Sequence, residues 1–322
     1  MRTKRFGRTE LQLPIVGIGT AFTGIPTQNE TVSESEDAPN PVDFELGVET
    51  LVAAIDAGCA FFDTAVLYNR SVSETMIGEA LRRRPKARDK ITISTKAGRS
   101  HEGYDFSFDA NVRSVHDSLE RMGLESIDIV YVHDAMGQPM ERVLADDGAL
   151  GALRHLQAQG LLRHIGTASN DPATNLGYIK TGEFDAAVMA DSWSLINQIA
   201  EREIFAAAAE HDVGLVAATP LERGLLATGP LSDTAYLNRR FSQACLDHVA
   251  KIQQLCARFS VSMLAVALQW CTQHPQVAST IPGARVPEEA ESSLAAAELQ
   301  IPEDFWLELD PLIKHFDTAI AV

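Results

Sequence analysis

Short runs of apolar and β-branched residues alternate with helical patterns along almost the whole chain of 322 residues. Each run has the length of one strand. The eight runs lie at 14–18, 60–63, 91–95, 127–133, 164–168, 186–190, 213–217 and 277–281. The segment 108–122 is typical of what lies between them, because its apolar residues recur at steps of three and four and share one helix face. This alternation predicts an α/β protein built as a (β/α)8 TIM barrel rather than an open doubly wound sheet.

Several segments add to a minimal barrel. Residues 4–13 predict an N-terminal β-hairpin that plugs the bottom of the barrel, and residues 240–258 predict a helix that lengthens the seventh connection. Residues 27–40 are polar and acidic, which is typical of a flexible insertion. We therefore expect long loops at the C-terminal mouth. No segment reads as a linker, so we expect residues 1–322 to form a single domain.

The start of one helix carries a local signal. Ser71 and Glu74 have the spacing of a capping box, in which the hydroxyl accepts from the Glu74 backbone N–H and the carboxylate reaches back. We expect the helix after the second strand to begin there.

The charge balance limits the classes of partner. The chain has 27 Lys and Arg against 44 Asp and Glu, a net charge of −17, which argues against nucleic acid and anionic membranes as partners. No signal peptide or membrane-spanning run is evident, and we expect a cytoplasmic protein. The four cysteines lack CxxC spacing and are expected to be reduced packing thiols. The nine histidines form no HxH or HExxH motif, so no metal site is predicted, and a metal-dependent hydrolase is disfavoured.

Four polar residues stand at or just after the ends of three consecutive predicted strands: Asp63, Tyr68, Lys96 and His133. The residues at 63, 96 and 133 are separated by 33 and 37 positions, about one βα unit each. Each alone has an ordinary explanation: a turn-forming aspartate, a surface aromatic or a hydrogen-bonded core histidine. The lysine is harder to explain, because lysine is seldom buried without a partner. Since strand ends converge at the barrel mouth, the four together predict a catalytic site.

The chemistry of this set suits proton transfer at a carbonyl or hydroxyl oxygen. A free tyrosine has a pKa of about 10, and a nearby ammonium such as that of Lys96 is expected to lower the pKa of Tyr68. Asp63 would keep Lys96 charged and in place. The imidazole of His133 could hydrogen-bond the substrate oxygen or relay the proton.

The segments around these residues resemble the signature of a known family. The stretches Asp63–Tyr68, Ser94–Lys96 and Val132–Asp134, together with Gly17–Thr20, are similar to those of the aldo-keto reductase superfamily, and the resemblance covers about residues 3–300. It implies a barrel enzyme that binds an extended nicotinamide cofactor at the mouth without a Rossmann domain. In agreement, the glycines near residue 17 lack the third glycine of a dinucleotide fingerprint.

The resemblance also implies cofactor contacts. They are Gly19, Thr20, Asp63, Ser169, Asn170, Thr219, Pro220, Leu221, Arg223, Gly224, Pro282, Gly283, Arg285, Glu289 and Ser293. Two positions depart from the family pattern: Ala218 stands where an aromatic residue often stacks on the nicotinamide, and Met189 stands near a frequent glutamine. The packing of the nicotinamide is therefore expected to differ.

The adenosine end predicts a preference for NAD over NADP. Where many NADP-dependent members carry a lysine and an arginine, this chain has Gly283 and Glu289. A carboxylate repels a 2′-phosphate and can accept from a ribose hydroxyl instead. Arg285 keeps the alternative open, because it could still reach a phosphate.

The substrate is expected to be a small-molecule sugar or aldehyde. Residues 95–107 and 118–121 are similar to the sugar-oxidising branch of the superfamily, whose members oxidise the C1 hydroxyl of an aldose to a lactone with NAD. In that interpretation Tyr68 is the base and His133 and Trp193 also line the substrate pocket, although ordinary core packing explains Trp193 equally well. The alternatives are a general aldehyde or ketone reductase and a non-catalytic nicotinamide-binding regulatory protein. No oligomeric state is predicted.

Overall fold

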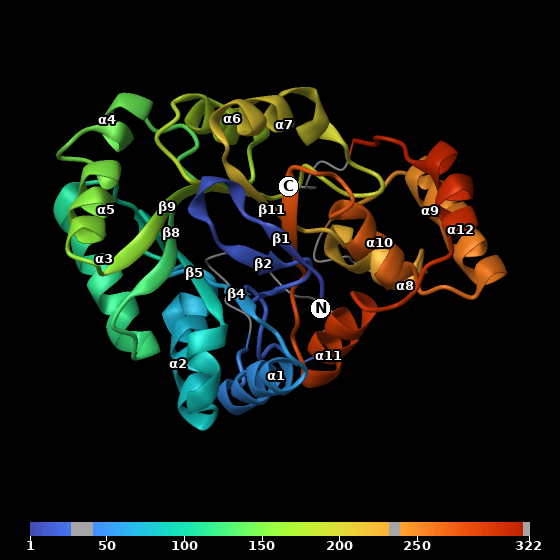
Figure 1. Ribbon diagram of the computed structural model, residues 1–322, viewed down its shortest axis with the longest axis horizontal. Coiled ribbons are helices and arrows are strands. Elements are labelled where there is room, and N and C mark those ends of the chain that lie inside the picture. The colour runs from blue at the N-terminus through green and yellow to red at the C-terminus, as the bar shows by residue number, and fades with distance from the viewer. Residues whose placement is uncertain (27–40, 232–238, 318–322) are drawn as a thin grey trace.

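The computed structural model describes residues 1–26, 41–231 and 239–317, and its centre is a closed sheet of eight parallel strands (Figure 1). In sheet order the strands are β3 (Ile18–Gly19), β4 (Phe61–Asp63), β5 (Thr92–Ala97), β8 (Ile127–His133), β9 (Leu162–Ser169), β10 (Ala186–Met189), β11 (Gly214–Ala218) and β12 (Val277–Ile281). Parallel bridges from Val16 to Thr280 and from Gly19 to Gly283 join the first strand to the last. The predicted (β/α)8 barrel is confirmed.

Helices surround this sheet, as Figure 1 shows. The ring consists of α1 (Phe44–Asp56), α2 (Val72–Arg83), α3 (Phe108–Met122), α5 (Ala149–Ala158), α6 (Pro172–Lys180), α7 (Ile199–His211), α10 (Met263–Cys271) and α11 (Pro287–Ala296). Further helices lie in the connections and after the ring: α4 (Met140–Leu144), α8 (Leu225–Thr228), α9 (Gln243–Phe259) and α12 (Glu303–Leu309). The α9 helix is the one expected in the seventh connection, and it packs with α12 outside α10.

The N-terminal hairpin lies across the end of the barrel where the strands begin (Figure 1). It pairs β1 (Thr3–Arg5) with β2 (Gln12–Pro14) in antiparallel register. The Lys4 ammonium donates to the carbonyls of Thr272, His274 and Val277 at 2.7–2.9 Å. The Phe6 ring enters the barrel against Gly214, where a Cβ would lie 2.5 Å from the ring. The predicted plug is therefore held by both hydrogen bonds and packing.

The strands are buried on both faces. Side chains inside the barrel, including Phe61, Tyr131 and Val216, form one cluster with Phe6, while the opposite strand faces pack against the helices. This double burial explains why the strands read as nearly continuous apolar runs. All four cysteines are free and buried, as expected. Within the described residues, no helix has both the length and the apolar character needed to span a membrane. The acidic insertion predicted at 27–40 lies outside the described residues.

The capping box predicted at α2 is not formed. Ser71 has a left-handed backbone with φ of 70°, and its hydroxyl donates to the Val66 carbonyl at 2.9 Å. Glu74 is fully buried and accepts from the Thr95 hydroxyl at 2.6 Å and from the Arg121 Nε at 2.7 Å. A buried carboxylate needs strong donors, and these come from β5 and α3 rather than from the helix end.

Candidate active site

The barrel brings the four predicted catalytic side chains together. Asp63 ends β4 and His133 ends β8, and β5, which carries Lys96, lies between these two strands. Lys96 lies inside β5 rather than after it. Tyr68 begins a short 3-10 turn, Tyr68–Ser71, in the loop after β4.

The Lys96 ammonium is the centre of the site. It donates to an Asp63 carboxylate oxygen, to the Thr64 carbonyl at 2.8 Å and to the Tyr68 hydroxyl at 3.1 Å. The other Asp63 oxygen accepts from the Ser94 hydroxyl at 2.7 Å. Burial disfavours the charge on Lys96, but Asp63 and Tyr68 outweigh it and raise the pKa of the ammonium above its usual value. Lys96 is therefore a buried cation with three acceptors for its three donors.

The net shift at Tyr68 is opposite to the sequence expectation. Burial is the largest influence and raises the pKa of the Tyr68 phenol, Lys96 lowers it as expected, and Asp63 raises it again. The net direction is upward. Without a bound cofactor and substrate, the phenol is therefore protonated at neutral pH.

His133 stands beside Tyr68 as a neutral imidazole. The two ring centroids are 6.0 Å apart and the rings are nearly perpendicular, at 88°. Burial lowers the pKa of His133 well below its usual value, and the charges of Lys96 and Arg99 lower it further. Nδ1 of His133 is buried and has no hydrogen-bond partner among the described residues. A neutral ring of this kind can exchange a hydrogen bond with a substrate oxygen without carrying charge.

A strained turn that no sequence pattern predicted holds Tyr68 in this place. Three consecutive non-glycine residues, Asn69, Arg70 and Ser71, have φ of 49°, 54° and 70°. The Asn69 amide donates to the Thr23 carbonyl at 3.1 Å and to the Ser73 hydroxyl at 3.0 Å. Left-handed backbone at such residues costs about 1–3 kcal/mol each and persists where neighbouring contacts impose it. No glycine marks this turn, so its sequence signal is weak.

The predicted cofactor residues also collect at the barrel mouth. Gly19 ends β3 and Thr20 follows it, Ser169 ends β9 and Asn170 follows it, residues 219–224 follow β11, and residues 282–293 follow β12 and enter α11. Because the strands are parallel, these ends lie at the same end of the barrel as the ends of β4 and β8, which carry Asp63 and His133. The sheet order therefore places the predicted cofactor residues around the opening in which Tyr68 lies.

Two observations fit a ligand at this mouth. The Thr20 hydroxyl is buried without a hydrogen-bond partner in the described part of the chain, as is Nδ1 of His133. A Cβ on Gly283 would meet only the Phe22 ring at 3.8 Å, so the backbone there is open to close approach. Buried polar groups are normally paired, and a bound dinucleotide and substrate would supply such partners.

The loop after β11 forms a buried charged cluster. The Glu222 carboxylate accepts from the Ser194 hydroxyl and from Arg239 at 2.7 Å. Asp191 lies 2.9 Å from Arg239 and 3.4 Å from Arg223. Burial raises the pKa of Glu222 to about 7 against the opposing influence of Ser194 and Arg239. Burial also lowers the pKa of Arg223 to about 10, which leaves it a cation at neutral pH.

Two of the residues predicted to bind the adenosine end, Arg285 and Glu289, form an ion pair. The Arg285 guanidinium donates to Glu289 at 2.7 Å, and the Arg285 backbone N–H donates to the other carboxylate oxygen at 2.8 Å. Ser293 lies buried one turn further along α11. Glu289 therefore already binds the cation that could otherwise reach a phosphate.

A model of the aldo/keto reductase family matches residues 17–314 of the chain. The chain belongs to the aldo/keto reductase family. It is therefore an oxidoreductase, from a family that uses nicotinamide cofactors.

Curated relatives of this aldo/keto reductase match over nearly their whole length. A D-threo-aldose 1-dehydrogenase from a Pseudomonas species is 29% identical over 93% of this chain and 94% of the relative. Pyridoxal 4-dehydrogenase from Microbacterium luteolum is 26% identical over 95% and 96%. NADH-specific methylglyoxal reductase from Escherichia coli is 26% identical over 94% and 95%. The holo form of an aldo-keto reductase from Bacillus halodurans has the same fold, with a TM-score of 0.77 and 23% identity over 100% of this chain and 98% of that one.

Trp193 is placed in the core rather than in the substrate pocket of this aldo/keto reductase. It is 5% exposed, stacks on Trp270 with ring centroids 4.6 Å apart, and donates from its indole N–H to the Cys271 carbonyl at 3.0 Å. Met189 packs in the same cluster, which lies between the sheet and the surrounding helices. The prediction that Trp193 lines the substrate pocket is wrong because its apolar neighbours and its N–H acceptor lie on the outer side of the barrel.

Two charged residues at the mouth were given no role in the sequence analysis. The Arg99 guanidinium donates to Asp134 at 2.5 Å, and Asp134 follows His133 directly. The signal for Asp134 was only its position next to a catalytic candidate, and a partner 35 residues away is not visible in a local pattern.

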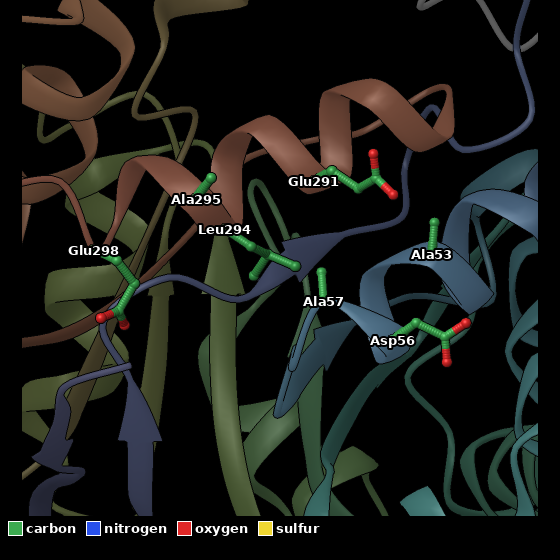
Figure 2. Close-up of a pocket in the computed structure, with 7 residues that line it drawn as sticks. All are labelled: Ala53, Asp56, Ala57, Glu291, Leu294, Ala295 and Glu298. Atoms are coloured by element: carbon green, nitrogen blue, oxygen red, sulfur yellow. The ribbon is translucent and has the colours of Figure 1, made fainter.

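A surface groove of about 450 Å³ lies outside the barrel, between α1 and α11 (Figure 2). Its lining comes from α1 and α11 and comprises Ala53, Asp56, Ala57, Glu291, Leu294, Ala295 and Glu298. Ala57 precedes β4, whereas Asp63 ends it, so the groove belongs to the opposite end of the barrel. It contains none of the predicted site residues.

Proposed function

We propose that this aldo/keto reductase oxidises the C1 hydroxyl of an aldose to a lactone with NAD. The observation that carries the proposal is the Tyr68 hydroxyl, which is hydrogen-bonded to the buried Lys96 ammonium and stands beside a neutral His133. The name of the Pseudomonas relative, D-threo-aldose 1-dehydrogenase, supports an aldose as the substrate.

In this proposal Tyr68 is the proton acceptor. Its phenolate takes the proton of the sugar C1 hydroxyl, and Lys96 at 3.1 Å stabilises that phenolate. Asp63 keeps Lys96 charged, and His133 hydrogen-bonds the reacting oxygen. When bound, the nicotinamide supplies the hydride acceptor. Because Asp63, Lys96 and His133 are buried, the charges of the Lys96–Asp63 pair act strongly on the neighbouring Tyr68 hydroxyl.

The NAD preference is supported by the Arg285–Glu289 pair. A 2′-phosphate would have to displace Glu289 from Arg285 and would lie against its carboxylate. A ribose hydroxyl can instead donate to that carboxylate. The Escherichia coli relative is named as NADH-specific, which agrees with this preference.

A second candidate is the reduction of an aldehyde or ketone. It is favoured by the raised pKa of Tyr68, because a protonated phenol is the form that donates a proton to a carbonyl oxygen. The Escherichia coli relative, named as a methylglyoxal reductase, supports this direction.

One experiment separates these proposals. A panel of aldoses, simple aldehydes and ketones is assayed with NAD(H) and NADP(H) at the nicotinamide absorbance, and the sugar product is identified as lactone by mass spectrometry. We expect lactone formation with NAD. The kcat/KM with NADP is expected to be at least about tenfold lower than the kcat/KM with NAD. Turnover of simple carbonyls alone would favour the second candidate, and no turnover with any substrate would favour a non-catalytic nicotinamide-binding protein.

A further inference from the structure

A small hairpin stands beside the catalytic residues at the barrel mouth. It pairs β6 (Arg99–Ser100) with β7 (Gly103–Tyr104) and follows directly from β5. Gly98 makes the sharp exit possible, since its φ is 91° and a Cβ there would lie 2.3 Å from the Phe106 ring. The hairpin thereby brings Arg99 back towards the end of β8.

Asp134 receives this arginine and is itself held on several sides. Its carboxylate accepts from the Arg99 guanidinium at 2.5 Å and from the Asn170 backbone N–H at 3.2 Å. Its own backbone has φ of 47°, and its N–H donates to the Ala168 carbonyl at 2.7 Å. Nε2 of His133 lies 3.6 Å from the same carboxylate. Asp134 therefore links the hairpin to the catalytic histidine candidate and to a predicted cofactor contact.

Arg99 is ordered but still accessible. Its guanidinium carbon lies 5.2 Å from the centroid of the Tyr104 ring, and Tyr104 in turn stacks on Phe106 with centroids 6.2 Å apart. The Arg99 side chain is 20% exposed, whereas that of Asp134 is 4% exposed. A guanidinium fixed by a carboxylate and an aromatic ring loses little further entropy when it donates to a ligand.

We propose that Arg99 and Asp134 form the subsite that recognises the sugar hydroxyls next to the reacting carbon. This inference rests on the proposed oxidation of an aldose. Neighbouring hydroxyl groups both donate and accept, and the pair offers guanidinium donors and a carboxylate whose oxygens each accept more than one hydrogen bond. Because Asp134 adjoins His133, hydroxyls bound there lie beside the oxygen that loses its proton.

The charge of the pair favours neutral hydroxyls over an acidic substituent. Asp134 already neutralises Arg99, so a substrate carboxylate or phosphate would meet a carboxylate as well as the cation. A neutral hydroxyl meets no such repulsion. The expected ligand is therefore an uncharged polyhydroxylated ring.

Deoxy sugars test the subsite directly. The kcat/KM of the best aldose is compared with those of its 2-deoxy and 3-deoxy analogues, in the wild type and in Arg99→Met. A charge-assisted hydrogen bond accounts for a factor of about 10 to 100, so we expect the wild type to favour the parent aldose by about that factor over at least one analogue. In Arg99→Met this discrimination falls to within about threefold, and the change lies mainly in KM.

Two further variants guard against damage to the fold. Arg99→Lys keeps the charge without the planar fork and is expected to discriminate to an intermediate degree. Arg202→Met changes an exposed arginine on α7 and is expected to behave as the wild type. The Kd for NAD, measured by fluorescence, is expected to stay within about threefold in all variants.

The outcomes are distinct. If the ratio of kcat/KM between the parent aldose and its deoxy analogues is the same in the wild type and in Arg99→Met, the subsite is overturned. The aldose dehydrogenase proposal is then left intact. A wild type that turns over no aldose overturns the proposed function and the subsite with it.

Discussion

Two of the pairs of opposite charge at the mouth of this barrel lie in very different surroundings. Lys96 and Asp63 are each 2% exposed, whereas Arg285 and Glu289 are 29% and 34% exposed. The sealed pair has no solvent to replace a lost partner, so it acts as a unit, and its two charges shift the pKa of Tyr68 in opposite directions. The open pair can be rearranged by a ligand at little cost. We therefore propose that the same kind of contact serves catalysis in one region and cofactor choice in the other.

Breaking the sealed pair has the largest expected effect. Lys96→Met removes the charge that stabilises the Tyr68 phenolate, and we expect kcat to fall about 10²- to 10⁴-fold. It also leaves Asp63 buried and unpaired, at a cost of about 3–5 kcal/mol in the free energy of unfolding. Steady-state kinetics and urea unfolding measure the two effects.

A double variant separates activity from stability in that test. Asp63→Asn together with Lys96→Met removes both charges, and we expect it to regain most of the lost stability while remaining inactive. If the double variant were as active as the wild type, the pair would have no role in proton transfer.

Reversing the charge of the open pair has a smaller and more selective effect. Glu289→Lys frees Arg285 and adds a second cation, so we expect the NADP/NAD ratio of kcat/KM to rise about 10- to 100-fold. Because Glu289 does not touch the catalytic side chains, kcat with the better cofactor should stay within about threefold.

A control for this variant lies on the same helix. Glu291→Lys makes the same charge change on α11 two residues further on, at a residue that lines the groove of Figure 2 instead of pairing with Arg285. An equal gain in NADP use from both variants would mean that net charge, rather than the Arg285–Glu289 contact, governs cofactor choice.

The smallest catalytic effect is expected in the core. Trp193→Phe loses the hydrogen bond to the Cys271 carbonyl and some packing against Trp270, which lowers the free energy of unfolding by about 1–3 kcal/mol. The KM for the sugar should change less than about twofold, because the indole is not in the mouth. An increase in the KM for the sugar with unchanged urea unfolding would show instead that Trp193 lines the substrate pocket.

The pattern of the sequence predicts the barrel well where the signal is local. The runs at 127–133 and 277–281 coincide with β8 and β12, since a continuous β-branched stretch is typical of a doubly buried strand. The convergence of Asp63, Lys96 and His133 follows from the same alternation, because each strand end must point to one mouth.

What was not predicted depends on partners distant in the chain. Glu74 has the local spacing of a cap, yet its strongest donor is Arg121, 47 residues further on. The upward shift at Tyr68 depends on how deeply the ring is buried, which no local pattern contains. Trp193 could serve as a sugar platform or a core residue, and only the positions of Trp270 and the Cys271 carbonyl decide between them.

The central claim is that Tyr68 moves the proton, and the pH dependence of sugar oxidation in the wild type and in Tyr68→Phe tests it most directly. Because the pKa of Tyr68 is raised and oxidation needs the phenolate, we expect the wild-type kcat/KM to keep rising with pH up to about 10, the usual tyrosine value. In Tyr68→Phe we expect kcat/KM to fall about 10²- to 10⁴-fold and the rise with pH to disappear. Undiminished turnover in Tyr68→Phe, with the same rise, would contradict the account.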